Sequence, residues 1–170
     1  YDIPANNATY DFRPAGGPVD RTDPDHRLIV DDDTCNACHD NLEFHGGARF
    51  NIDYCVMCHN PYSIDPDTAA DPWGGTVDMT EMIHKIHFGE NLNNGYAVIG
   101  YGGTLHDYSD IVFTQAANNC DTCHNESDAN TPQASNYYEV PTRRACGACH
   151  DDVDWAAGGH PGGVTFADDA

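Results

Sequence analysis

Basic residues are scarce in this chain: Lys and Arg number 7 against 28 Asp and Glu, which gives a formal net charge of −21. Such acidity repels phosphate backbones and anionic lipid surfaces, so we expect no nucleic-acid or anionic-membrane partner. Cationic partners, mineral surfaces and divalent ions suit this charge, although solubility alone also accounts for it. The acidic runs Asp31–Asp33 and Asp151–Asp152 are candidate calcium ligands, although solvated surface explains them more simply.

Long apolar runs are also lacking. The longest apolar runs are of the size of Leu28–Val30 and Tyr96–Ile99. A membrane-spanning helix needs roughly 20 apolar residues. We therefore predict no membrane span. The chain begins at Tyr1 and shows no leader sequence, so we interpret it as a mature, exported protein that works outside the cytoplasm, either in the periplasm or in the extracellular space.

Apolar residues make up only 39% of the chain, which carries 16 glycines and 10 prolines. A chain of 170 residues with this composition would bury only a small core of its own side chains. A bound apolar group that replaces part of the core would resolve this shortage.

The motif Cys-x-x-Cys-His occurs four times and uses all eight cysteines, at Cys35–His39, Cys55–His59, Cys120–His124 and Cys146–His150. It is the attachment sequence of c-type haem. The two thiols form thioethers with the vinyl groups of one porphyrin, and the histidine lies under the iron as its proximal ligand. The sequence therefore predicts four covalent haems c, held by Cys35, Cys38, Cys55, Cys58, Cys120, Cys123, Cys146 and Cys149, with His39, His59, His124 and His150 as proximal ligands.

Paired cysteines are also found in two other kinds of site, zinc sites and disulfides. Eight thiols could build two four-thiolate zinc sites, or four disulfides in a secreted chain. Neither alternative explains the histidine after every pair. Because histidine accounts for 10 of 170 residues, four chance occurrences have a probability of roughly one in a hundred thousand.

Four haems would be both the core and an electron path, since 170 residues are too few to wrap each haem separately. We therefore expect a multihaem cytochrome c fold, mostly irregular, with few short α-helices and minimal β-structure around a haem-stack core. The first 33 residues have four prolines and no haem motif. They predict an extended arm over 1–33, followed by a tetrahaem domain over 34–170.

One longer helix is predicted over residues 78–89. Apolar residues at 79, 82, 83 and 86 share one face, Asp78 suits the N-cap, Glu81 takes the capping-box position and Gly89 suits the C-terminal stop. Other helices are expected as single turns around each haem motif. Residues 95–103 and 108–114 are the candidates for short strands.

Six histidines remain for the distal face of four irons: His26, His45, His84, His87, His106 and His160. Only three methionines are present, and Met79 and Met82 belong to the apolar face of the predicted helix. Bis-histidine coordination is therefore favoured. An iron with two protein ligands has no open position, so the chemistry indicated is low-potential electron transfer, not catalysis.

The context of the motifs resembles the pentahaem domains of outer-membrane decahaem cytochromes of the OmcA and MtrC type. The resemblance lies in Cys35–Arg49, Cys58–Pro61 with Asp65–Asp67, Met82–His87, Leu105–Asp110, Cys146–Asp154 and His160–Gly163. It implies that His45, His84, His87 and His160 are the distal ligands, with His106 and His26 in reserve. It also implies stacked haems that receive electrons from redox partners at the outer membrane. The acceptors it implies are minerals, electrodes or soluble shuttles.

The family domain carries five haems, and this chain has motifs for four. In this respect it is similar to extracellular tetrahaem nanowire subunits of the OmcE type, which polymerise. The resemblance favours a repeating subunit of a conductive cytochrome filament at the cell surface or outside the cell. A monomeric periplasmic or surface shuttle is the alternative. A multihaem reductase is disfavoured, because it would need an open haem and positive charge for an anion.

Overall fold

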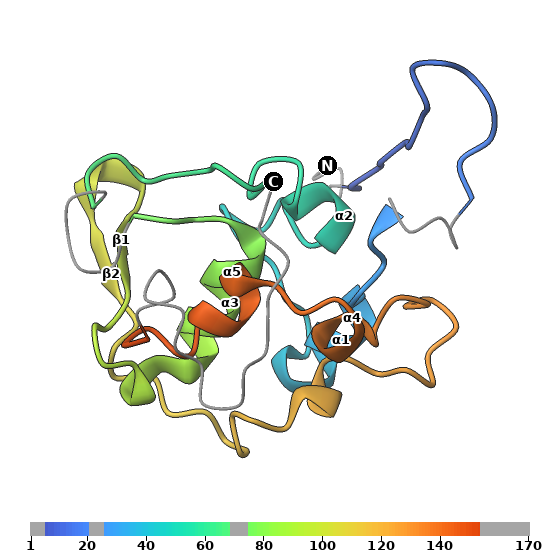
Figure 1. Cartoon of the computed structure of the whole chain (residues 1–170). Coiled ribbons are helices and arrows are strands. Elements are labelled where there is room, and N and C mark those ends of the chain that lie inside the picture. Colours follow the sequence, from blue (N-terminus) through green and yellow to red (C-terminus); the bar gives the residue numbers. More distant parts are fainter. Residues whose placement is uncertain (1–5, 21–25, 69–74, 154–170) are drawn as a thin grey trace. The chain divides into compact units, whose positions relative to one another are not determined.

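Regular structure is sparse in the computed structural model, which describes residues 6–20, 26–68 and 75–153 (Figure 1). This agrees with the predicted mostly irregular fold. No helix in these ranges is long and apolar enough to cross a membrane. The elements are α1 (Asp32–His39), α2 (Ile52–Cys55), α3 (Met79–Phe88), η2 (Gly89–Asn91), β1 (Ala97–Ile99), η3 (Tyr101–Gly103), β2 (Leu105–Asp107), η4 (Cys120–Thr122), α4 (Asn136–Glu139) and α5 (Arg143–Gly147).

The chain divides into two compact units. Unit 1 comprises Tyr1–Cys58 and Cys120–Glu139, and unit 2 comprises His59–Asn119 and Val140–Ala170. Each unit is therefore built from two separate stretches of sequence. The second haem motif lies at the boundary, with its thiols in unit 1 and its histidine in unit 2.

Aspartates join the first two haem-motif helices in unit 1. The Asp31 carboxylate caps α1 by accepting hydrogen bonds from the N–H and hydroxyl of Thr34, both at 2.9 Å. The carboxylate of Asp32, in the first turn of α1, accepts from Ile52 N at 2.6 Å and from Asn51 Nδ2 at 2.7 Å. Asp32 thus fixes the start of α2 against α1. Two short helices that would be unstable alone are stabilised by these contacts.

The described part of the N-terminal arm, residues 6–20, contains no helix or strand. It is held by the side chain of Asn7. The Asn7 Nδ2 donates to Ala48 O at 2.9 Å, while its Oδ1 accepts from Phe50 N at 2.9 Å and Asn51 N at 3.2 Å. One amide therefore fixes the arm to the segment that leads into α2.

Helix α3 in unit 2 confirms the predicted helix and both of its ends. The Asp78 carboxylate accepts from Thr80 N at 3.0 Å and Glu81 N at 3.3 Å, as an N-cap does. In a full capping box the side chain of Glu81 would accept a hydrogen bond from Asp78 N. Here Asp78 N donates to Thr76 Oγ1 instead, at 3.3 Å. At the C-terminus Gly89 has φ +40°, a conformation that L side chains rarely adopt.

A two-stranded antiparallel sheet follows, in which Val98 of β1 pairs with His106 of β2 (Figure 1). The first strand lies within the predicted range 95–103. The prediction for 108–114 is wrong, because the partner strand comes earlier. Tyr108 N donates to Tyr96 O at 2.8 Å, and Ile111 N then donates to Tyr108 O at 3.1 Å in a turn. These bonds direct the backbone into a turn, and it does not continue as a strand.

Buried apolar side chains are few within the described ranges: Leu28, Tyr96, Ala97, Ala134 and Ala148. Many large apolar side chains there are exposed instead, among them Phe44, Met57, Ile64 and Val112. The largest fully buried side chain, Tyr96, donates its hydroxyl to Thr76 O at 2.6 Å and stacks on Tyr108. The protein core is thus as small as the composition predicts.

Candidate haem-binding sites

The four Cys-x-x-Cys-His motifs all lie on helical turns, as predicted. The first lies in α1, the second begins at the end of α2, the third begins with η4 and the fourth begins in α5. In the third and fourth copies the histidine N–H donates to the carbonyl of the first cysteine, from His124 to Cys120 and from His150 to Cys146, both at 2.9 Å. None of the eight cysteines forms a disulfide, and four of these residues are exposed: Cys38, Cys58, Cys120 and Cys123.

Unit 1 brings thiols from three motifs together. Burial, followed by the charges of Cys123, Asp32, Asp31 and Cys55, raises the pKa of the Cys35 thiol to about 11. Cys123 is an exposed residue, but desolvation of its thiol by nearby protein atoms, followed by the charge of Cys38, raises the pKa of that thiol. Cysteines of the first and third motifs are therefore close enough to interact electrostatically. With such pKa values they stay protonated at neutral pH, as thiols that add to vinyl groups do.

This arrangement does not suit the alternative zinc sites. A structural zinc site needs four converging ligands, usually thiolates or imidazoles. Over residues 6–20, 26–68 and 75–153, no group of three or more His, Cys, Asp or Glu is placed to hold a metal ion. The eight cysteines likewise do not form the disulfides considered above.

His59, a predicted proximal ligand, is oriented by its backbone and by its ring. The Nδ1 lies 2.8 Å from Val77 O, and because a carbonyl only accepts, Nδ1 carries the proton. Nε2 then presents its lone pair, which is the form that ligates iron. Met79 N donates to His59 O at 2.9 Å. The residues just before and at the start of α3 therefore hold this ligand.

The two predicted distal ligands on α3 are both half-buried. His87 Nδ1 lies 2.8 Å from Ile83 O one turn earlier, so its Nε2 is also available to a metal. The imidazole packs edge-on against Phe113, with 5.4 Å between centroids and 86° between planes. Phe113 and Phe88 line a cavity of about 380 Å³ in unit 2. The cavity also has polar walls, from Glu90, Asn91, Gln115 and Asn118, so the aromatic surface beside His87 is the ring of Phe113.

The other distal candidates differ in exposure. His45 lies at the tip of a hairpin-like turn closed by the Phe44–Arg49 bridge, has φ +53° and is exposed. The ring of His106 lies directly over Gly100, where an added Cβ would overlap it. His26 contacts Asp11, with 2.8 Å between Nε2 and Oδ2. His160 lies outside the described residues.

His124 is the predicted proximal ligand with the most elaborate surroundings. Burial lowers its pKa, while a hydrogen bond with the Ala134 backbone and the charge of Asp121 act in the opposite direction. Tyr137 packs against the imidazole at 5.2 Å between centroids. Sequence reasoning missed Tyr137, because nothing local in the sequence associates residue 137 with a motif that ends at 124.

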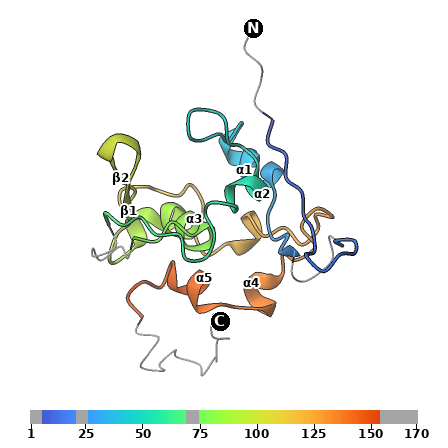
Figure 2. The same ribbon diagram turned by 90° about the horizontal axis from the view of Figure 1, so that it is seen from above.

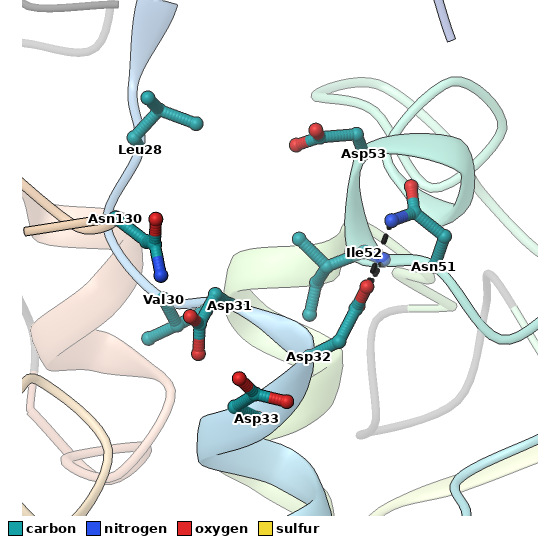
Figure 3. A pocket seen from close by; sticks show the side chains of 9 residues that line it. All are labelled: Leu28, Val30, Asp31, Asp32, Asp33, Asn51, Ile52, Asp53 and Asn130. Carbon is teal, nitrogen blue, oxygen red and sulfur yellow. Dashed lines mark hydrogen bonds between the residues drawn. The ribbon is translucent and has the colours of Figure 1, made fainter. Parts of the chain in front are cut away.

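The acidic run at residues 31–33 lines a cavity of about 250 Å³ in unit 1 (Figure 3). Asp53, Asn51 and Asn130 complete its polar wall. Asp31 and Asp32 are engaged in capping α1 and in holding α2, respectively. In the part of the chain that the structure describes, no cluster of three or more His, Cys, Asp or Glu residues is placed to hold a metal ion. The known contacts of Asp31 and Asp32 are therefore structural, and calcium binding by this acidic run stays a prediction.

Comparison with known proteins agrees with this geometry. Residues 27–169 match a family model described as outer membrane cytochrome MtrC/MtrF-like, domains II/IV. The chain is 29% identical over 161 residues to the multiheme cytochrome MtrC of Shewanella baltica (strain OS185), a match that covers 93% of this chain and 19% of that protein. The crystal structure of the outer membrane decaheme cytochrome OmcA matches with a TM-score of 0.65 and 31% identity, over 73% of this chain and 19% of that one. The crystal structure of MtrC from S. baltica OS185 matches at 28% identity and a TM-score of 0.49, over 78% of this chain and 17% of that one.

The chain is therefore a multihaem cytochrome domain. It belongs to the MtrC/MtrF-like family of outer-membrane cytochromes, and the resemblance to the OmcA and MtrC type is confirmed. It spans about a fifth (19%) of the length of the curated relative it matches. The family match covers all four Cys-x-x-Cys-His motifs.

Proposed function

We propose that this chain is an electron-transfer domain that carries four covalent c-type haems and delivers electrons to an acceptor outside the cell. The observation that carries the proposal is the fourfold Cys-x-x-Cys-His motif, each copy on a helical turn and none of its cysteines in a disulfide. Bound haem c supplies a one-electron iron couple. The polypeptide attaches it, supplies axial ligands and excludes water from it.

Each haem has a defined set of protein ligands in this proposal. The thioether cysteines and the proximal histidines are those of the four motifs. The proposed distal ligands are His45, His84, His87 and His160, with His106 and His26 in reserve. The hydrogen bond from His87 Nδ1 to Ile83 O supports its role, since it leaves Nε2 for the iron. The contact of His26 with Asp11 and that of His106 with Gly100 support their reserve status.

Bis-histidine ligation makes the domain a carrier and not an enzyme. Donation of the His59 Nδ1 proton to Val77 O and of the His87 Nδ1 proton to Ile83 O makes each imidazole more basic. A more basic ligand favours ferric iron, so the midpoint potentials are low. A potentiometric titration followed by optical and electron paramagnetic resonance (EPR) spectra tests this. Four low-spin, low-potential haems are expected, and a high-spin component would contradict full bis-histidine ligation.

The haems form a stack that replaces the missing protein core. The small number of buried apolar side chains supports this, because apolar porphyrin plates would cover the exposed ones. The electrostatic interaction of Cys35 and Cys38 with Cys123 supports it further, because it brings the attachment points of two haems together within unit 1.

The domain acts as the repeating subunit of a homopolymeric cytochrome filament, extracellular or at the cell surface; the alternative is a monomeric shuttle. Exposed aromatic side chains on the arm, Tyr10 at 87% and Phe12 at 69%, support an association surface. The net charge of −21 opposes association. Light scattering and electron microscopy in low and high salt discriminate the two, because screening favours a polymer of like-charged subunits. A monomer under all salt conditions would favour the shuttle.

A further inference from the structure

The third haem motif lies against a segment that contacts its histidine without belonging to the motif. This segment, residues 131–139, lies in unit 1 and ends in α4. Tyr137 of α4 packs on the His124 imidazole with 5.2 Å between centroids and 44° between planes. Its hydroxyl donates to Asp121 Oδ1 at 2.8 Å. Tyr137 therefore touches the motif twice, at the histidine and at the residue that follows the first cysteine.

The position of Tyr137 is fixed from outside the motif. Gln133 N donates to Leu28 O at 3.1 Å, and the Gln133 side chain accepts from Leu28 N in return. Gln133 and Leu28 are both buried. Thr131 Oγ1 donates to Asn125 O at 3.0 Å, directly after the motif. A four-residue helix has little stability of its own, so these anchors determine where α4 places its tyrosine.

Tyr138 offers an internal comparison. Its ring contacts that of Tyr137 edge-on at 4.8 Å, and its hydroxyl donates to Glu126 Oε2 at 3.0 Å. The two neighbours are thus alike in type and in hydrogen bonding to a carboxylate. Tyr137 is half-buried and contacts the candidate ligand, whereas Tyr138 is 51% exposed.

We propose that Tyr137 is a positioning residue for the third haem: tethered to Asp121, it sets the orientation of the His124 imidazole and thereby the potential of the haem held by Cys120 and Cys123. The inference rests on the proposed function, since it concerns a haem ligand. Groups around an axial histidine orient its ring and tune the metal. Here the aromatic face of Tyr137 does so beside the hydrogen bond that His124 makes with the Ala134 backbone. The acidic partner adds a second influence, because a negative charge within the motif favours ferric iron.

The variants Tyr137→Leu, Tyr137→Phe and Tyr138→Phe separate these roles in the full haem-loaded chain. Tyr137→Leu removes the aromatic ring and the tether, Tyr137→Phe removes only the tether, and Tyr138→Phe is the matched control. The readouts are the EPR spectrum of the oxidised protein and the midpoint potentials of its haems. We expect Tyr137→Leu to shift the EPR signal and the potential of one haem in four. Tyr137→Phe should produce a smaller shift towards lower potential, and Tyr138→Phe should match the wild type.

Asp121→Asn tests the tether independently. The substitution should raise the potential of the same haem, because it removes the negative charge of Asp121. In the double variant Asp121→Asn/Tyr137→Phe the potential should not change further, because the hydroxyl of Tyr137 then has no charge to offset. If Tyr137→Leu changed none of the four haems, or all four equally, the positioning role would be refuted. Failure of the proposed function would look different, because the wild-type chain itself would then lack haem absorbance.

Discussion

The guanidinium of Arg144 lies 3.5 Å from the buried carboxylate of Asp78, Nη1 to Oδ2, and joins α5 to α3. The two helices lie side by side in unit 2 (Figure 2). Asp78 is only 2% exposed and also caps α3, while Arg144 lies two residues before Cys146. This ion pair therefore connects the helix of two candidate distal ligands to the helix that begins the fourth haem motif.

Replacement of Arg144 by Met should destabilise unit 2 by about 2 kcal/mol, since it leaves a buried carboxylate without its cation. The loss is below that of a fully buried pair because the Arg144 side chain is 22% exposed. Guanidinium denaturation of the haem-loaded protein, followed by circular dichroism, measures it. The double variant Asp78→Asn/Arg144→Met should lose less unfolding free energy than the two single variants lose together. Additive losses would show that the two side chains act independently.

Acid should weaken unit 2 partly through Asp65. Burial raises its pKa, but hydrogen bonds from Ile99 N, the Thr68 hydroxyl and Asp67 N outweigh burial, and the pKa lies below its ordinary value. The stability gained from the ionised form is therefore complete above about pH 4 and is lost as the pH falls below that value. Urea midpoints between pH 3 and 7 should fall less steeply in Asp65→Asn than in the wild type. Parallel profiles would rule out this contribution.

His87→Ala should convert one low-spin haem to a high-spin form, because it removes a proposed distal ligand whose Nε2 is available to iron. His84→Ala should do the same to another haem. His106→Ala is the control and should leave every haem low-spin. Optical spectra of the ferric proteins report the change. A high-spin signal in His106→Ala, combined with none in His84→Ala, would exchange the roles of these two histidines.

Asn7→Ala should release the arm, because one side chain supplies all three hydrogen bonds that hold it to Ala48, Phe50 and Asn51. Each hydrogen bond contributes about 1 kcal/mol, so without Asn7 the arm should lose most of its preference for the docked position over a released one. Chymotrypsin should then cleave after the arm residues Tyr10 and Phe12 several-fold faster than in the wild type. Asn6→Ala, the neighbouring amide, is the control. Equal cleavage rates in all three proteins would show that Asn7 does not hold the arm.

Local sequence patterns predicted the local structure well. The apolar spacing and end residues of α3 located both ends of the helix, because Asp78 and Gly89 act on their immediate neighbours. The single turns at the haem motifs followed from the motifs themselves. The strand expected at residues 108–114 was wrong, because pairing with β1 depends on a turn between the strands and not on the apolar character of one segment.

Long-range contacts gave no sequence signal. Tyr137 meets His124 through an anchor between Gln133 and Leu28, which are 105 residues apart in the chain. Arg144 meets Asp78 across 66 positions (144 − 78). The haem motifs identified the cofactor, because its chemistry fixes the spacing of the thiols. The residues that orient its ligands depend on tertiary packing, so they required the structure.

The number of haems per chain tests the account most directly. Intact-protein mass spectrometry of the chain expressed with a cytochrome c maturation system should give the polypeptide mass plus that of four haems. Replacing both cysteines of any one motif with alanine should lower the mass by one haem and leave the other three attached. A polypeptide that carries no covalent haem, or that carries zinc in its place, would contradict the account.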